Sequence, residues 1–213
     1  EITPADEIAR IRPALEAARG LLPVSVDTRK AAVAQAALQA GAGMVNDVSG
    51  FDFDADLPGL VARAGVPVCL MHAQGLPQTM QDDPRYDDVL LDVYDALEAR
   101  IARAVAAGIP RHRIVIDPGI GFGKTEAHNL AILRRISLYH GLGCPILLGV
   151  SRKRFIGRIG GAELPADRVP GTLALTVAAI AQGVQIHRVH DVAEHAQALR
   201  LVAALNETRE AGQ

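Results

Sequence analysis

The stretch that decides the fold is Ile114-Val115-Ile116-Asp117-Pro118-Gly119-Ile120-Gly121-Phe122-Gly123-Lys124-Thr125. Three apolar β-branched residues in a row predict a short strand that is covered on both faces, as in a parallel sheet. The strand ends at the carboxylate of Asp117, and a proline and three glycines then surround Phe122. In α/β proteins, ligands bind at this carboxyl edge of the sheet. We therefore expect Asp117 and Phe122 to belong to a ligand site.

The end of this stretch looks like two phosphate-binding motifs and matches neither. Gly123-Lys124-Thr125 would close a P-loop only if residue 118 were glycine, and Pro118 stands there. The glycines at 119, 121 and 123 also lack the GxGxxG spacing of a dinucleotide fold. A plainer alternative stays open at this point, in which Asp117 only caps the turn that follows the strand.

Length and composition indicate one soluble globular domain over residues 1–213. The chain is 49% hydrophobic and 22% charged, with a net charge of −2, so nothing indicates a nucleic-acid or membrane surface. It has no run of 18 apolar residues and no secretory leader, so we expect no membrane span and a cytoplasmic protein. Cys69 and Cys144 lie in apolar contexts without CxxC spacing, which predicts buried thiols in a reducing compartment rather than a disulfide.

The whole chain alternates between strand-like and helix-like segments. Strands are predicted at 24–27, 44–47, 66–71, 114–117, 145–150 and 184–189, and helices at 4–19, 30–40, 57–64, 87–107, 126–136, 168–182 and 191–205. Such alternation predicts a parallel sheet with right-handed crossovers. The one long loop, 73–86, is of the kind that usually serves function.

Polar residues follow the predicted strands at nearly every exit. They are Asp27, Asn46, His72 after Met71, Asp117, Ser151 with Lys153, and Arg188 with His190. In a closed barrel all these exits meet at one mouth, whereas in an open sheet only those near the switch point converge. A full set of polar exits therefore favours a TIM barrel.

Each exit also has a plainer explanation. Asp27 could cap the next helix, Asn46 could belong to a turn, and His72 could be a structural histidine. Lys153 lies in a charge run, and Arg188 with His190 could be a solvated strand end. Six coincidences at six strand ends are harder to accept than one, so the set favours a functional mouth.

The types of side chain at the mouth describe a ligand with two different ends. Two acids and an amide, Asp27, Asn46 and Asp117, suit the N–H edge of a planar, nitrogen-rich heterocycle. Phe122 can pack against such a ring. Lys153, Arg188 and His190 supply cationic and hydrogen-bonding groups for phosphate.

The ordered motifs resemble the dihydropteroate synthase family of pterin-binding enzymes. The matching segments are Val26-Asp27-Thr28-Arg29-Lys30, Asn46-Asp47-Val48-Ser49-Gly50, Met71-His72-Ala73-Gln74-Gly75, Asp117 to Lys124, Gly149-Val150-Ser151-Arg152-Lys153 and Arg188-Val189-His190-Asp191-Val192. The resemblance implies a (β/α)8 barrel, of which six β/α units are present. It also implies a transferase that joins 6-hydroxymethyl-7,8-dihydropterin pyrophosphate to p-aminobenzoate in folate biosynthesis.

The resemblance also implies roles for individual residues. Asp27, Asn46, Asp117 and Lys153 would hold the pterin edge, Val48, Met71, Phe122 and Gly149 would form its walls, and Arg188 would lie along its face. Arg188 and His190 would hold the pyrophosphate, and Ser151 and Lys153 would reach the aminobenzoate. Asp27, Lys153 and Arg188 are the expected catalytic residues, Mg²⁺ the expected cofactor, and a homodimer through the late helices the expected assembly.

One departure from the family and two rival functions remain. The family's first two strands, with an asparagine linked to Mg²⁺, would lie before Glu1, so we expect no metal ligand in this chain and an N-terminally incomplete domain. One rival is a pterin-dependent methyltransferase, which would need no pyrophosphate cradle at Ser151-Arg152-Lys153 or Arg188-Val189-His190. The other rival is a non-catalytic pterin-binding paralogue.

Overall fold

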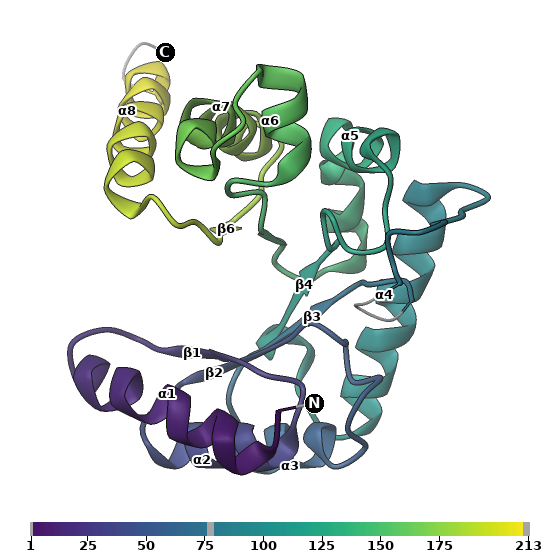
Figure 1. The fold of residues 1–213 in the computed structure, drawn as a ribbon, viewed down its shortest axis with the longest axis vertical. Helices are drawn as coiled ribbons and strands as arrows, with labels where there is room; N and C mark the ends of the chain where they lie inside the picture. Colours follow the sequence, from purple (N-terminus) through teal and green to yellow (C-terminus); the bar gives the residue numbers. More distant parts are fainter. Residues whose placement is uncertain (1, 76–78, 211–213) are drawn as a thin grey trace.

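The computed structural model describes residues 2–75 and 79–210, which form parallel strands alternating with helices (Figure 1). The strands are β1 (Ser25–Asp27), β2 (Met44–Asp47), β3 (Val68–Met71), β4 (Ile114–Asp117), β5 (Leu147–Leu148) and β6 (Ile186–His187). The helices are α1 (Pro4–Ala18), α2 (Ala31–Gln39), α3 (Leu57–Ala64), α4 (Val89–Ala106), α5 (Glu126–Arg134), α6 (Arg154–Gly160), α7 (Val169–Ile180) and α8 (Val192–Glu210). The predicted alternation is confirmed, and part of the predicted loop, residues 76–78, lies outside the described residues.

The strands stand side by side in chain order and form a curved wall. β1 to β4 make one parallel sheet in that order, and near their carboxyl ends Asp27 pairs with Asn46 and Met71 pairs with Asp117. β5 and β6 form a second parallel pair, joined to β4 by a single bridge between Ile116 and Ile146. All carboxyl ends therefore point to the same side of the wall, as a barrel requires.

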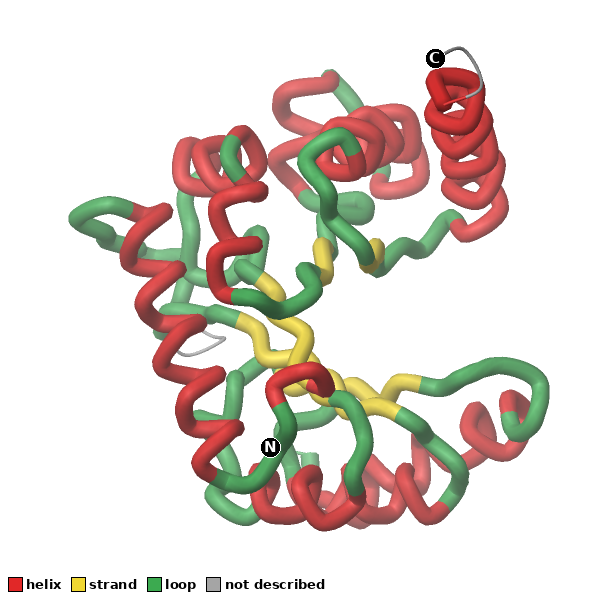
Figure 2. Tube along the Cα trace, turned by 180° about the vertical axis from the view of Figure 1, so that it is seen from behind, coloured by secondary structure: helices red, strands yellow, loops and turns green. Residues whose placement is uncertain are grey.

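Both faces of the wall are apolar, which explains why the strands are continuous apolar runs. Successive side chains of a strand point to opposite faces. Cys69, Val115 and Leu147 form a small inner cluster, while Leu70, Ile114 and Ile116 belong to the large core that packs against the helices. The helices accordingly cover the outer side of the strands (Figure 2). Cys69 and Cys144 are both buried and free, as predicted.

Two strands are shorter than predicted, one helix was missed and the last helix is longer than predicted, whereas the other predicted boundaries lie within two residues of those in the structure. β5 and β6 have two residues each instead of six, and for β5 a reason lies in Pro145, which cannot donate to a ladder, and in Gly149. Helix α6 was not predicted, because its sequence Arg-Phe-Ile-Gly-Arg-Ile-Gly carries two glycines and reads as a loop. The last helix continues to Glu210 rather than ending at 205. The predicted helix start at residue 4 is confirmed, and the Thr3 side chain caps this helix by accepting from the Asp6 amide.

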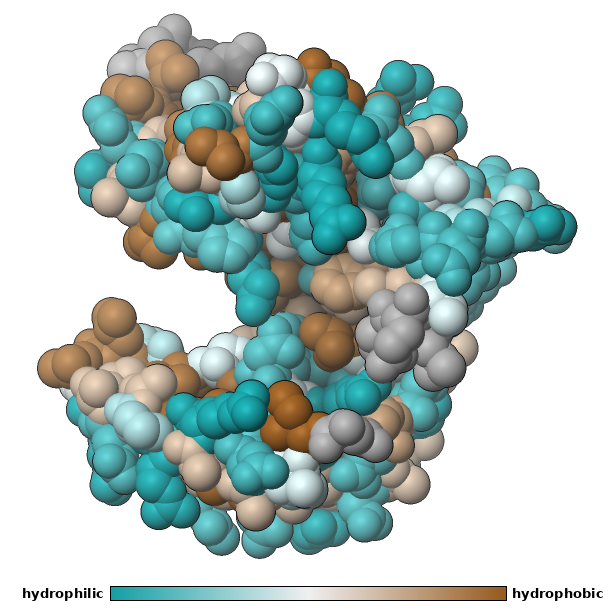
Figure 3. All heavy atoms as spheres, viewed as in Figure 1, coloured by the Kyte–Doolittle hydropathy of each residue, from teal (hydrophilic) through white to brown (hydrophobic). Residues whose placement is uncertain are grey.

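The wall is open on one side. Among the described residues, no strand pairing joins β1 to β6. The space-filling view shows a hollow on that side, between the N-terminal helices and the group formed by α6, α7 and α8 (Figure 3). One ion pair spans the two ends, because Arg188 Nη2 lies 3.1 Å from Asp27 Oδ2.

Candidate active site

The carboxyl ends of the strands surround a cavity of about 380 Å³. Its lining consists of Asp27, Asn46, Val48, Met71, Asp117, Ile120, Phe122, Gly149, Ser151, Lys153, Arg188 and His190. Of the polar residues that follow the predicted strands, all but His72 are in this lining, as are the predicted wall residues Val48, Met71, Phe122 and Gly149, and their roles there stay predictions. Sequence reasoning missed only Ile120, although an apolar residue between two loop glycines beside Phe122 was a usable signal.

The acidic end of the cavity is built by β1, β2 and β4. Asn46 Nδ2 donates to Asp27 Oδ2 over 3.1 Å, and Arg188 donates to the same oxygen. Asn46 Oδ1 is buried and has no hydrogen-bond partner among the described residues. A buried acceptor without a partner is costly, so this oxygen is suited to an N–H group of a ligand. Asp27 does not cap α2, because Asp54 Oδ2 accepts from the Ala31 amide instead.

Asp117 combines the two alternatives that its sequence position left open. Its Oδ1 accepts from the Gly119 amide over 2.7 Å, so it does fix the turn after β4, and it also lines the cavity. Burial raises the pKa of Asp117 to about 6, although the Gly119 hydrogen bond and the charges of Lys124, Lys153 and Arg188 lower it. A carboxyl group near neutrality in a cavity is typical of functional sites.

The glycine loop after Asp117 lies directly against the segment after β3. A Cβ at Gly119 would lie 1.8 Å from the His72 carbonyl oxygen, and one at Gly123 would lie 2.3 Å from the Gln74 carbonyl oxygen. Both residues also have positive φ, so only glycine fits there. This close contact places the Phe122 ring beneath Lys153, whose Nζ lies 4.4 Å from the ring centroid.

The basic end depends on a turn with one strained residue. Arg152 has a φ of 57°, an uncommon backbone conformation for a non-glycine residue. Its amide donates to Thr172 Oγ1 over 3.1 Å, its carbonyl accepts from Arg168, and its guanidinium pairs with Asp191. These contacts direct the next residue, Lys153, into the cavity. Burial lowers the pKa of Lys153, and Asp117 opposes that effect.

Ser151 and His190 form a hydrogen-bonded unit beside Lys153. Ser151 Oγ accepts from the His190 amide over 3.1 Å and lies 2.8 Å from His190 Nδ1. Arg188 is held next to them, since its amide donates to the Leu148 carbonyl over 3.0 Å. The arrangement brings cationic and hydrogen-bonding side chains together at the end of the cavity, as an anion site needs.

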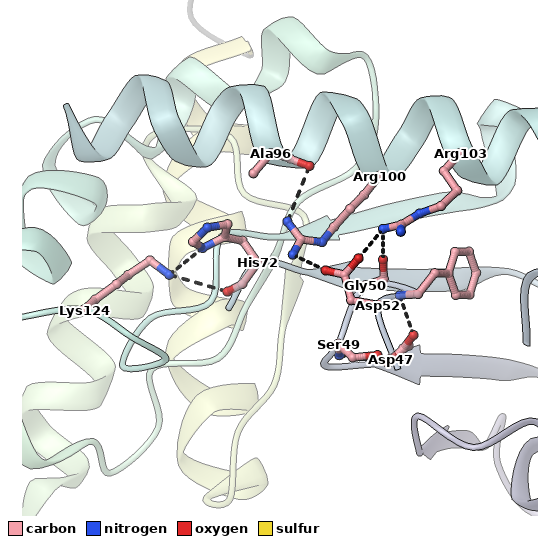
Figure 4. Close-up of polar contacts among 10 residues, drawn as sticks. Asp47, Ser49, Gly50, Asp52, His72, Ala96, Arg100, Arg103 and Lys124 are labelled. Carbon is pink, nitrogen blue, oxygen red and sulfur yellow. Dashed lines mark hydrogen bonds and ion pairs between the residues drawn. The ribbon is translucent and has the colours of Figure 1, made fainter. Parts of the chain in front are cut away.

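The loop after β2 is held from behind by acidic and basic side chains (Figure 4). Asp47 is fully buried and accepts from the amides of Ser49 and Phe51. Burial raises the pKa of Asp47. Arg100 and Arg103 reach from α4 to the two oxygens of Asp52, at 2.8 Å and 2.7 Å. This framework fixes the loop that carries Val48 into the cavity.

A second and larger cavity of about 820 Å³ shares Phe122 and Lys153 with the first. Its remaining lining was missed by the sequence reasoning: Met80, Gln81, Gly121, Lys124, Thr125, Glu126, Asn129, Arg154, Phe155 and Arg158. Gln81 Nε2 donates to the Gly121 carbonyl over 2.6 Å, so the long loop takes part in this wall. The length of that loop was the available signal.

The position of His72 favours a structural role over a binding role, because it is buried outside the lining of either cavity and its Nδ1 lies 2.8 Å from Lys124 Nζ. In residues 2–75 and 79–210, no group of three His, Cys, Asp or Glu side chains could hold a metal ion. The helices in that part of the chain include none with the length and apolarity needed to span a membrane.

Comparisons with known proteins agree with this geometry. The family model described as pterin binding enzyme matches residues 1–190. A dihydropteroate synthase of Neisseria meningitidis serogroup B is 43% identical over 209 residues, covering 96% of this chain and 73% of that protein.

Solved structures give the same result. A Thermus thermophilus dihydropteroate synthase in complex with 6HMPPP has a TM-score of 0.90 at 47% identity, over 95% of this chain and 80% of the other. A Xanthomonas albilineans dihydropteroate synthase with 4-aminobenzoic acid also has a TM-score of 0.90, at 42% identity, over 96% of this chain and 73% of the other. The present chain therefore spans about three quarters of the length of these proteins.

Proposed function

The chain belongs to the dihydropteroate synthases of the pterin-binding enzyme family, and from that premise we propose how its two cavities divide the substrates. Its fold is the α/β fold of the synthases, with the parallel sheet of their TIM barrel, and its reaction is a transferase reaction. The reaction joins 6-hydroxymethyl-7,8-dihydropterin pyrophosphate to p-aminobenzoate and gives 7,8-dihydropteroate and pyrophosphate.

The pterin ring occupies the smaller cavity. One observation carries this assignment: acceptors gather at one end of that cavity, where Asn46 Oδ1 is buried and has no partner in the part of the chain that the structure describes. Asp27 and Asp117 accept further N–H bonds from the same edge of the ring. Val48, Met71, Phe122, Gly149 and Ile120 supply the walls.

The pyrophosphate lies at the basic end, against Arg188 and His190. Cationic groups placed there stabilise the charge that grows on the leaving oxygen as the methylene C–O bond breaks. The carboxylates of Asp27 and Asp117 line the same cavity, where they stabilise the cationic pterin methylene left behind. The amino nitrogen of p-aminobenzoate then forms a C–N bond to that carbon and loses one proton. No covalent enzyme intermediate is needed.

The p-aminobenzoate enters through the larger cavity. The two cavities share Phe122 and Lys153, so a ring in the larger one can bring its amine toward the pterin methylene. Lys153 Nζ lies over the Phe122 ring and faces Asp117, which makes it the link between the two substrates. The Xanthomonas structure with 4-aminobenzoic acid supports a site for this substrate in the family.

Mg²⁺ is the cofactor that the family resemblance implies. The described residues contain no cluster of His, Cys, Asp or Glu ligands for it, so no step of the proposal passes through the metal. We also propose a homodimer, supported by the exposed apolar side chains of Val192, Leu201 and Leu205 on α8. The buried free thiols support a cytoplasmic location, and residues 1–213 are proposed to form one pterin-binding domain.

The test is to follow pyrophosphate release from the pterin pyrophosphate in the presence of Mg²⁺, with and without p-aminobenzoate. The synthase reaction predicts release that depends on p-aminobenzoate and gives stoichiometric 7,8-dihydropteroate. Pterin binding with no release would favour the non-catalytic paralogue. Methyl transfer from a reduced folate, with no release, would favour the methyltransferase relative.

A further inference from the structure

Lys124 is a buried cation to which the proposed reaction assigns no role. It is one of only three lysines in the chain, and its residue is 2% exposed. Its Nζ lies 2.8 Å from His72 Nδ1 and within 3.0, 3.1 and 3.4 Å of the carbonyl oxygens of Gly119, Phe122 and His72. Burying an ammonium is expensive unless such partners surround it, so these contacts are the reason it can lie there.

The partners of Lys124 belong to two different strand exits. Gly119 and Phe122 lie in the glycine loop after β4, and His72 is the first residue after β3, as Figure 4 shows for His72 and Lys124. The loop already lies against His72, because Gly119 has no room for a Cβ there. The ammonium therefore fastens the loop to the neighbouring strand exit at both Gly119 and Phe122.

We propose that Lys124 is a positioning residue for both substrates, acting through the loop that it ties to the end of β3. Gly119 donates to the Asp117 carboxylate over 2.7 Å, so holding Gly119 also orients Asp117. Holding the Phe122 carbonyl fixes the ring that the two cavities share. This inference rests on the proposed roles of Asp117 and Phe122.

The charges around Lys124 give the proposal a second consequence. Lys124 faces Asp117 on β4, Arg100 on α4 and Lys153 before α6, and it contacts His72 after β3. Burial lowers the pKa of Lys124 to about 7 and that of His72 to about 2, so His72 is a neutral acceptor. Below pH 7 Lys124 is charged, and its positive charge lowers the pKa of Asp117. The charges of Lys153 and Arg188 act on Asp117 in the same direction.

The main experiment compares Lys124→Met with Lys124→Arg in the intact enzyme. We expect Lys124→Met to lower kcat/KM for the pterin pyrophosphate by about 100-fold, the effect of misplacing reacting groups by roughly 1 Å. We also expect the KM for both substrates to rise and the acidic limb of the pH profile of kcat/KM to move to higher pH, because Asp117 loses a neighbouring positive charge. Lys124→Arg should return that limb toward its original pH.

Lys30→Met is the matched control. Lys30 is also largely buried and donates to the Ile2 carbonyl and to Glu7, but it lines neither cavity. It should leave KM and the pH profile unchanged. If Lys124→Met lowers only the amount of folded enzyme, with wild-type KM values and pH limb, Lys124 is merely structural and the proposal is overturned. Wild-type enzyme without synthase activity would instead overturn the proposed function.

A measurement without activity covers the case in which Lys124→Met does not fold. In protein with ¹³C-labelled lysine, the three lysine signals are few enough to follow Lys124 through a pH titration. Because coupling between two sites is reciprocal, Asp117→Asn should lower the titration midpoint of Lys124 and leave Lys30 unchanged. An unchanged Lys124 midpoint would overturn the proposal.

Discussion

Replacing Asp117 by asparagine should have opposite effects on binding and on stability. Asparagine has the same shape as aspartate, and its Oδ1 can still accept from the Gly119 amide, which lies 2.7 Å from Asp117 Oδ1 in the present structure. What is lost is the negative charge. If Asp117 holds the pterin edge, the lost charge-assisted hydrogen bonds should weaken pterin binding by roughly 2–3 kcal/mol, which is about 30- to 150-fold in Kd.

The same substitution should stabilise the protein at neutral pH. The pKa of Asp117 is raised from 3.8 to about 6, because burial disfavours the charged form. The folded state therefore holds this proton more tightly than the unfolded state, and its stability falls as pH rises from about 4 to about 6. One pKa unit corresponds to about 1.4 kcal/mol, so at pH 7 the asparagine variant should gain about 1–3 kcal/mol of unfolding free energy.

Two assays measure these effects. Urea denaturation of both proteins from pH 4 to 8 gives the difference in unfolding free energy, in which the other titrating groups largely cancel. Titration calorimetry with the pterin pyrophosphate gives the Kd. A stability difference that does not change with pH, or an unchanged Kd, would refute the reasoning. Asp88→Asn is the control, because Asp88 caps α4 on the surface and asparagine caps equally well.

Three further predictions test the surroundings of the site. Gly119→Ala should lower the unfolding free energy measured by urea denaturation by about 2–5 kcal/mol, because the new Cβ would lie 1.8 Å from the His72 carbonyl oxygen and the residue has a positive φ. Gly161 has the same φ of 69° but open space around its Cβ position, so Gly161→Ala should lower it by only about 1–2 kcal/mol. Arg100→Met should destabilise by about 1–2 kcal/mol and the more exposed Arg103→Met by less than about 1 kcal/mol, although both arginines pair with Asp52; equal losses would contradict a framework role for Arg100. A crystal soaked in sulfate or phosphate should show the anion between Arg188 and His190, and an anion elsewhere with that place empty would contradict the pyrophosphate assignment.

Much of the site could be predicted because parallel topology brings distant residues together. Val26, Val45 and Ile116 mark buried strands by apolarity alone, and the residues that follow such strands must meet at one edge. The register that places Asp27 beside Asn46 then needs no side-chain detail. The larger cavity could not be predicted in this way, since Met80, Asn129 and Arg158 come from a loop and two helices whose packing is set by the tertiary fold.

Lys124 was misjudged for a related reason. A lysine after a glycine suggests a phosphate ligand, and rejecting the P-loop pattern left the residue without a role. The sequence does not reveal that the loop folds back on His72, which turns the ammonium inward to three carbonyls. The burial of the Lys124 ammonium, rather than the residue type, therefore decides its role.

For Asp117 and Asp27, the sequence left open whether each carboxylate caps a turn or helix or lines the ligand site, and the positions of the carboxylate oxygens distinguish these alternatives. Asp117 precedes Pro118, and the following Gly119 amide turns back within 2.7 Å, so one oxygen makes the cap while the residue still lines the cavity. After Asp27 the chain runs through Thr28, Arg29 and Lys30 before α2 starts at Ala31, and Asp54 from the neighbouring loop accepts from the Ala31 amide. Asp27 Oδ2 instead accepts from Asn46 and Arg188, within the cavity. A capping pattern therefore excludes a binding role only where the nearest free amides use both oxygens of the carboxylate, and neither aspartate meets that condition.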